Sequence, residues 1–138
     1  MQASQITSAI DGRNIGCQAW AIYPKIRDVD AVLQQAPQLQ NWVLEVHPEV
    51  TFRELNGGVS ISQRKKSSQG RAARVALIGA GAFTAVRSRY LVKQVGHDDI
   101  ADAFAALWTA ERKLNGQAVS IPATPQIDST GLRMEIWY

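Results

Sequence analysis

The sequence predicts an α/β fold, because long helical patterns alternate with short β-prone segments. The clearest helix covers residues 98–116, where apolar residues recur at helical spacing and Gly116 supplies a stop. The clearest strand covers residues 41–47, which are mostly apolar and β-prone, and the following Pro48 ends it. One central strand cannot bury both faces and pair both edges, so the sheet expected from this chain is under-built.

The remaining elements follow from the same kinds of pattern. The first dozen residues are polar and carry Asp11-Gly12, so they predict a loose lead-in. Apolar residues on one broad stripe predict a helix over residues 15–35, which Pro24 interrupts and Pro37 closes. In chain order we then expect a short helix over 48–55, a helix over 71–78, an ambiguous stretch that allows a helix over 83–95, and a proline-containing tail leading to a strand or extended segment over 132–138.

The size and composition are those of an ordinary globular protein. With 138 residues, of which 46% are apolar and 20% charged, the chain fits a single domain over residues 1–138 and is not expected to be disordered. No apolar run is long enough to cross a bilayer, and the first residues lack the pattern of a secretory signal. Cys17 is the single cysteine, which excludes an internal disulfide, favours a reducing compartment and so predicts a cytoplasmic protein. Because Cys17 lies on a helical face near Trp20, we expect it to be a small core residue.

A cluster of basic residues is the main charge feature of a chain whose formal net charge is +3. Arg64, Lys65 and Lys66 are consecutive, and Arg71 and Arg74 follow. Such a cluster can neutralise phosphates and attract nucleic acid by releasing counterions, and we expect Lys65, Lys66 and Arg71 to make these contacts. The competing interpretation is an ordinary solvated loop.

Three carboxylates are the candidate metal ligands and catalytic groups. Asp99 and Asp102 are three residues apart, so on a helix they lie on neighbouring parts of one face. Carboxylate pairs of this kind can bind divalent metals, which prefer hard oxygen ligands. Glu45 lies in the otherwise apolar strand, where a charge is costly unless something pairs with it. A strand carboxylate facing the Asp pair would suit a magnesium site for phosphodiester hydrolysis.

The same acidic residues have a structural interpretation. Asp98 and Asp99 stand where a helix start favours capping residues, and Asp102 would complement the helix dipole near the first turn. Glu45 would then be a strand-edge charge that points to solvent. Spacing alone leaves capping and catalysis both open.

Several blocks of sequence, in the same order, resemble those of the predicted RNase H-like nucleases, a family catalogued as a domain of unknown function. The most distinctive block runs from Glu45-Val46-His47-Pro48-Glu49 through Phe52 to Gly58. The likeness covers nearly the whole chain, and this chain resembles the carboxy-terminal half of that family. The matching blocks are residues 18–20, 24–26, 45–49, 52, 55–58, 65–66, 70–72, 98–103, 108–110 and 131–137.

The resemblance implies a partial RNase H-like fold, in which helices pack on a small mixed sheet. It also implies Mg²⁺ or Mn²⁺ as cofactor and nucleic acid, DNA or RNA, as substrate. The pattern Asp99-x-x-Asp102-Ala103 is similar to the carboxy-terminal acidic helix of RuvC-type resolvases, which share this fold. Asp99 and Asp102 would then be metal ligands, with Glu45 a third.

The chain departs from the family at its amino-terminal side. Nothing before Gln18 matches the family's first strands, which carry an Asp on the first strand and another acid on a later one. The implied sheet and metal site would therefore be incomplete, through truncation or because a second chain or copy completes the sheet. The alternative to an active nuclease is an inactive remnant or a module that binds nucleic acid or protein.

Three further features have competing interpretations. Residues 75–84 imitate a dinucleotide-binding glycine turn, but Thr84 replaces the last glycine and a helix ending in glycine is the simpler interpretation. His47 and His97 are expected to be loop histidines, because two distant histidines without a cysteine partner do not support a zinc site. The four tryptophans are expected to pack, with base stacking by an exposed one left open: Trp20, Trp42, Trp108 and Trp137.

Overall fold

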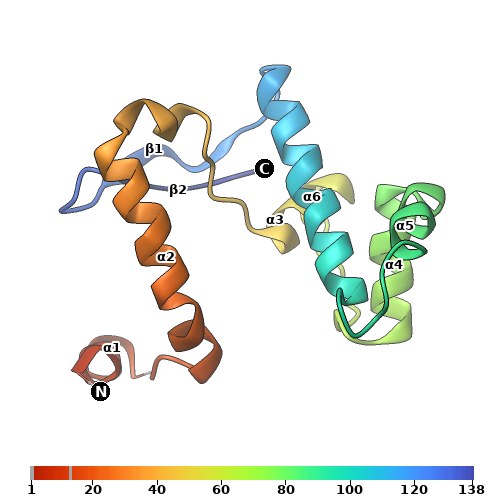
Figure 1. Ribbon diagram of the computed structural model, residues 1–138, viewed down its shortest axis with the longest axis horizontal. Coiled ribbons are helices and arrows are strands. Elements are labelled where there is room, and N and C mark those ends of the chain that lie inside the picture. The colour runs from red at the N-terminus through yellow and green to blue at the C-terminus, as the bar shows by residue number, and fades with distance from the viewer. Residues whose placement is uncertain (1, 13) are drawn as a thin grey trace. The chain divides into compact units, whose positions relative to one another are not determined.

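The computed structural model describes residues 2–12 and 14–138 (Figure 1). The chain divides into two compact units, one of Met1–Val43 with Ile127–Arg133 and the other of Leu44–Gln126 with Met134–Tyr138. The α/β class predicted from the sequence is confirmed. The elements are α1 (Gln2–Asp11), α2 (Cys17–Gln35), η1 (Pro37–Asn41), α3 (Pro48–Leu55), α4 (Ser68–Ile78), α5 (Ala80–Arg87), α6 (His97–Leu114), β1 (Ser120–Ile127) and β2 (Arg133–Trp137).

Helix α6 is the centre of the second unit, because α3, α4 and α5 all contact it (Figure 1). Its buried face carries Ile100, Ala101 and Ala105, which pack with Phe52 of α3 and Phe83 of α5. The small side chains of Ala101 and Ala105 let the neighbouring helices approach α6 closely. The helices predicted over residues 48–55, 71–78 and 98–116 are confirmed to within a few residues.

The close packing of α3 on α6 also buries two hydroxyl groups. The side chains of Thr51 and Thr109 are fully buried and lie 2.9 Å apart, Oγ1 to Oγ1. A buried hydroxyl without a partner would lower stability, so each threonine satisfies the other. This pair fixes the register of α3 along α6.

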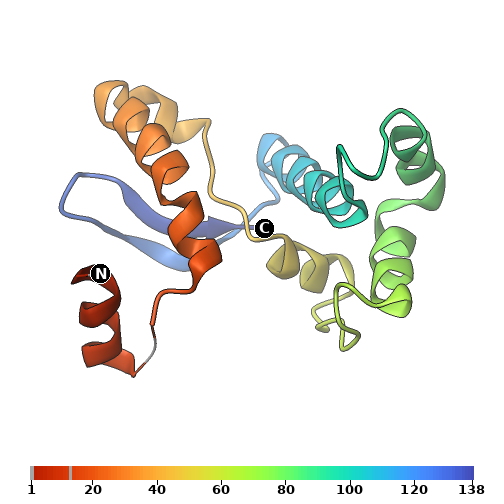
Figure 2. The same cartoon turned by 60° about the horizontal axis from the view of Figure 1, so that its bottom comes forward.

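Among the described residues, the sheet consists of β1 and β2, an antiparallel pair drawn in blue in Figure 2. The strand predicted over residues 41–47 is wrong. Residues 37–41 form the 3-10 helix η1, whose final turn continues through the bond from Trp42 N–H to Leu39 O, and Val46 makes one isolated parallel bridge with Trp137. Strand β1 was missed because Pro122 and Pro125 suggest irregular chain, but prolines are tolerated on a strand with a free edge.

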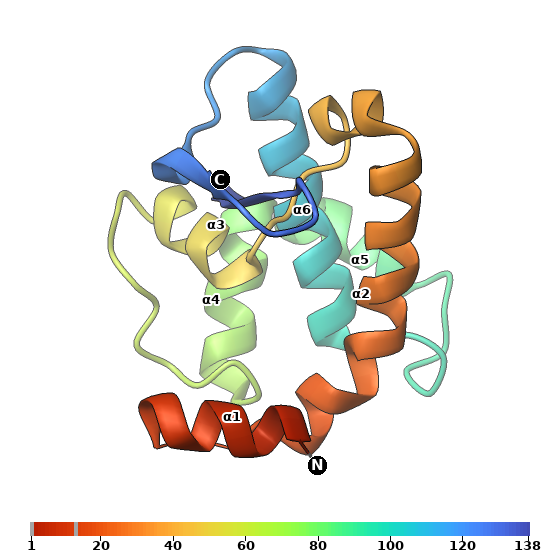
Figure 3. The same ribbon diagram turned by 90° about the vertical axis from the view of Figure 1, so that its left-hand side faces the viewer.

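The first unit differs from expectation in three places. Residues 2–11 form helix α1 rather than a loose lead-in, with Ile6 and Ile10 one helical turn apart in the polar sequence. Pro24 lies inside α2, which continues through it to Gln35 (Figure 3). Cys17 is exposed and is not a core residue. Apolar side chains along α2 are about half exposed: Trp20 55%, Ile22 50%, Ile26 44%, Val29 49% and Val32 52%.

Asp128 organises the turn between β1 and β2. Its Oδ1 accepts hydrogen bonds from the backbone N–H groups of Thr130 and Leu132 and from the Thr130 hydroxyl. The Leu132 bond, followed by the Thr130 hydroxyl, lowers the pKa of this carboxyl below its ordinary value. The stabilisation therefore belongs to the ionised form, and it is lost as pH falls through the lowered pKa.

A close approach of two backbone segments leaves no room for a side chain at Gly70. A Cβ at this position in α4 would lie 2.1 Å from the carbonyl oxygen of Arg64. We predict that Gly70→Ala lowers the free energy of unfolding by about 1–3 kcal/mol, because the backbone must shift to remove the clash. Chemical denaturation followed by circular dichroism measures the change.

Gly81→Ala is the matched control, because Gly81 is also helical but has nothing within 4 Å of an added Cβ. This variant should be stabilised by up to about 1 kcal/mol, since alanine favours a helix more than glycine does. Equal effects of the two substitutions would contradict the role of the contact.

Candidate functional site

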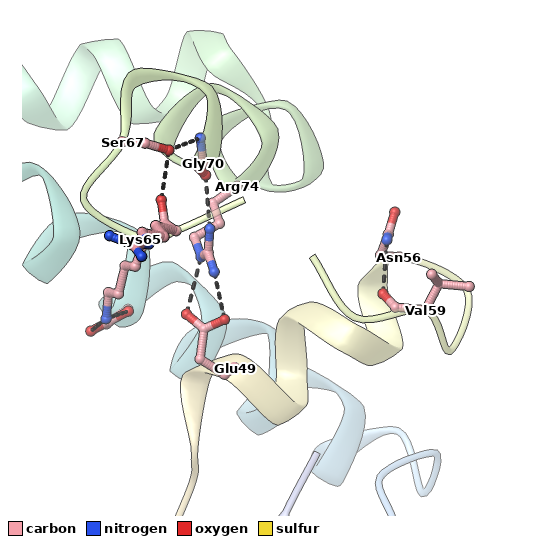
Figure 4. A network of polar contacts seen from close by, with 9 residues as sticks. Glu49, Asn56, Val59, Lys65, Ser67, Gly70 and Arg74 are labelled. Carbon is pink, nitrogen blue, oxygen red and sulfur yellow. Dashed lines mark hydrogen bonds and ion pairs between the residues drawn. The ribbon is translucent and has the colours of Figure 1, made fainter. Parts of the chain in front are cut away.

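The basic residues Arg64, Lys65, Lys66 and Arg71 are called the basic segment below. The first three lie on a fixed turn before α4, and Arg71 lies in the first turn of that helix. The Ser67 hydroxyl donates to the Arg64 carbonyl at 2.8 Å, and its oxygen accepts from Gly70 N–H at 3.0 Å (Figure 4). Ser67 is therefore the N-cap of α4, a position at which serine is favoured. Together with the contact between Gly70 and Arg64, these bonds fix the backbone that carries the cations.

Three side chains of the basic segment point to solvent. Arg64, Lys66 and Arg71 are exposed. The Arg71 guanidinium donates to the Lys66 carbonyl at 2.7 Å, which closes the turn without neutralising either charge. Across residues 2–12 and 14–138, no salt bridge joins any of these three to a carboxylate.

Lys65 is the exception, because Asp102 of α6 holds its ammonium group. The Nζ atom donates to both carboxylate oxygens of Asp102, at 2.6 and 2.9 Å. The two side chains are 34% and 30% exposed, so the ion pair is partly shielded from water. The pair connects the basic segment to the helix that carries the predicted metal ligands.

Arg74 and Glu49 form a second ion pair on the other side of the turn (Figure 4). The Arg74 side chain is 4% exposed and donates to both oxygens of Glu49, at 3.0 and 2.6 Å. It also donates to the Gly70 carbonyl at 2.9 Å and lies over the Phe52 ring at 5.7 Å. Arg74 is thus a buried structural group rather than part of the phosphate-binding cluster that its sequence position suggested.

The three predicted acidic ligands have different surroundings. Asp99 is exposed and accepts the Gly96 N–H at 2.8 Å, which closes the first turn of α6 as a capping carboxylate does. The Asp102 carboxylate forms an ion pair with Lys65. Glu45 has an exposed side chain, and its carbonyl accepts from Trp137 N–H at 2.8 Å.

These positions do not make a metal centre by themselves. Within the part of the chain that the structure describes, no group of three or more His, Cys, Asp or Glu side chains is suited to hold a metal ion. Divalent magnesium requires several oxygen ligands in a near-octahedral arrangement. The residues present therefore do not fit the ion that the sequence resemblance implies.

A family assignment follows from comparison with known proteins. Residues 1–127 match the model of a family described as "Protein of unknown function (DUF429)". The chain belongs to this DUF429 family. No curated protein and no solved structure matches it. Among the described helices, none is both long and apolar enough to cross a membrane.

Other groups singled out in this DUF429 sequence do not form the sites considered for them. Gly79 joins α4 to α5 without a preceding strand, so the strand–turn–helix arrangement of a dinucleotide site is not formed there. His47 precedes α3, and the His97 ring stacks on Phe83 with centroids 6.0 Å apart. Neither histidine lies in a metal-binding group of the described residues.

The tryptophans divide into two classes. Trp108 and Trp137 pack beneath cations, with Arg112 at 4.6 Å and the Lys113 ammonium at 3.2 Å from the respective ring centroids. Trp20 and Trp42 are 55% and 75% exposed. The Trp20 ring lies 5.9 Å from that of Tyr23, so Trp42 is the one tryptophan among the four for which the expected packing is not confirmed.

The ion pair of Arg74 and Glu49 should be the more costly of two pairs to break. We predict that Glu49→Gln in this DUF429 protein lowers the free energy of unfolding by about 1–3 kcal/mol, because a buried guanidinium loses its anionic partner. Glu54→Gln is the control, since Glu54 lies 3.6 Å from a less buried Arg112 and should change stability by at most about 1 kcal/mol. Urea denaturation of both variants compares them, and equal losses would contradict the structural role of Arg74.

Proposed function

We propose that this DUF429 protein binds nucleic acid through the phosphate backbone and that the exposed cations of the basic segment, Arg64, Lys66 and Arg71, make the contact. Exposed lysine and arginine side chains near one another neutralise several phosphates and release the counterions condensed on the nucleic acid. Such contacts position a protein on its substrate without reading base sequence. The proposal therefore names a class of ligand, a polyanionic nucleic acid, and no base sequence.

One observation carries this proposal: three exposed cations lie on the fixed turn and on the first turn of α4, and they have no carboxylate partner among the described residues. Arg64, Lys66 and Arg71 differ in this respect from Arg74 and Arg112, which pair with glutamates. Because the turn is already fixed, ordering its backbone adds little to the entropy cost of binding.

The sequence resemblance supports the same class of ligand. The blocks shared with predicted RNase H-like nucleases include Lys65-Lys66 and Gly70-Arg71-Ala72, which form this turn and the start of α4. We propose that the family fold is RNase H-like on this resemblance. The described chain contributes a two-stranded sheet, so in this proposal a second chain or copy supplies further strands.

Replacing Lys66 should weaken nucleic-acid binding in a salt-dependent way. The slope of log affinity against log salt concentration should fall in magnitude by about 0.9 for duplex DNA in Lys66→Ala, because one phosphate contact is lost. Fluorescence anisotropy with a labelled mixed-sequence duplex, in the presence of EDTA, measures this slope.

Lys93→Ala is the matched control, because Lys93 is an exposed lysine of the same unit outside the basic segment. Its slope should stay at the wild-type value. Equal losses from Lys66 and Lys93 would mean that net charge, and not this turn, binds the nucleic acid.

We propose metal-dependent phosphodiester hydrolysis as a second candidate function. One observation favours it: the Asp102 carboxylate is 30% exposed beside the basic segment, on the helix that also carries Asp99, and it would be open to a metal ion once Lys65 leaves it. Asp99 and Glu45 are the other proposed ligands, with Mg²⁺ or Mn²⁺ as the ion. The described residues do not complete such a site, so this candidate requires further oxygen ligands, supplied in our proposal by the partner chain or copy.

Hydrolysis would appear as cleavage that depends on added metal. We expect Mg²⁺- or Mn²⁺-dependent cleavage of DNA or RNA by the wild-type chain to be abolished in Asp102→Asn and retained in Asp98→Asn, which removes a neighbouring charge of the same helix. Gel analysis of labelled oligonucleotides measures it. Cleavage that survives Asp102→Asn, or binding without turnover at any metal concentration, would reject hydrolysis at this site while leaving the binding proposal in place.

A further inference from the structure

We infer that Asp102 withholds Lys65 from phosphates, so that the ion pair sets how many cations this protein presents to a nucleic acid. The inference rests on the proposed binding function and names a residue that sets the affinity for nucleic acid. It concerns a residue on a different helix from the basic segment, Asp102 of α6.

The geometry of the pair makes Lys65 unlike its neighbours. Its ammonium group donates to both oxygens of one carboxylate, at 2.6 and 2.9 Å, whereas Lys66, the adjacent residue, has no salt bridge among the described residues. Charge-assisted hydrogen bonds of this length are among the stronger ones. They engage two of the three N–H donors of the ammonium group and offset its charge, so Lys65 has less to offer a phosphate than an unpaired lysine has.

The backbone of the turn holds Lys65 next to α6. Ser67 is bonded to the Arg64 carbonyl through both its N–H, at 2.9 Å, and its hydroxyl, at 2.8 Å. Gly70 packs against the same carbonyl, and α4 contacts α6. The lysine is therefore presented to Asp102 by a fixed scaffold, and little backbone freedom is lost when the pair forms.

Because the ion pair is partly exposed, Asp102 and a phosphate would bind the Lys65 ammonium group with similar strength. Both side chains are about one third exposed, so solvent weakens the ion pair relative to a fully buried one. A lysine–phosphate contact at the protein surface is weakened by solvent in the same way. Exchange of one anionic partner for another of similar strength yields little net affinity, and Lys65 then adds almost nothing to binding.

The test combines substitutions of both partners in the full chain. Asp102→Asn should release Lys65, so that affinity for a labelled duplex in EDTA rises several-fold and the salt slope steepens by about 0.9. The double variant Asp102→Asn with Lys65→Ala should return to the wild-type slope, because the released cation is removed. Asp98→Asn, which deletes a charge without freeing a lysine, should keep the wild-type slope.

Other results would overturn the inference. A slope unchanged in Asp102→Asn, or steepened equally when Lys65 is absent, would show that Asp102 acts through general charge or not at all. If Lys66→Ala leaves the slope unchanged, the proposed function fails and the inference fails with it. If Lys66→Ala lowers the slope but Asp102→Asn does not steepen it, the inference alone fails.

A measurement on the unmodified chain covers the case in which a variant does not fold. Lysine side-chain NMR signals should move strongly for Lys66 and weakly for Lys65 as a short duplex is added in EDTA. Equal movement of the two signals would overturn the inference, because Lys65 would then be a full phosphate contact.

Discussion

The helical unit depends on the interactions of one buried group, the guanidinium of Arg74. An almost fully buried charge is tolerated only where its donors are satisfied, and here Glu49 of α3 and the Gly70 carbonyl of α4 accept them. The same group lies over Phe52, the fully buried aromatic residue of α3. One side chain thus fixes the distance between two helices that both pack on α6.

This constraint explains why the neighbouring cations are available at the surface. The turn before α4 is anchored from within, by Arg74 on the Gly70 carbonyl and by Gly70 against the Arg64 carbonyl. Because backbone contacts hold the turn, Arg64, Lys66 and Arg71 are not needed as salt-bridge partners for stability. Neighbouring basic residues therefore have different roles: one is structural, one is paired with Asp102, and three are exposed.

Local patterns predicted the helices well and the sheet poorly. Helix α3 begins at Pro48 and ends before Asn56-Gly57-Gly58, and both boundaries are set by residues at those positions. The segment 41–47 has the composition of a strand, but strand formation depends on partners elsewhere in the chain, and only Val46 obtains one. For the site, spacing placed Asp99 and Asp102 near one another on α6. It could not show that Asp102 pairs with a lysine 37 residues away, or that Glu49 and Arg74, 25 residues apart, are the buried pair.

The chemistry available to Asp102 is decided by which cation it holds. A carboxylate whose two oxygens accept hydrogen bonds from an ammonium group is a poorer metal ligand, because that cation repels a metal ion, so the ion pair and a metal site compete for the same atoms. Loss of the pair would free a cation on the basic segment and a carboxylate on α6 at once. Nucleic-acid binding by Lys65 and metal binding by Asp102 would therefore support each other, while the intact pair opposes both. The linkage arises from the position of one lysine between the exposed cations of the basic segment and an acidic helix.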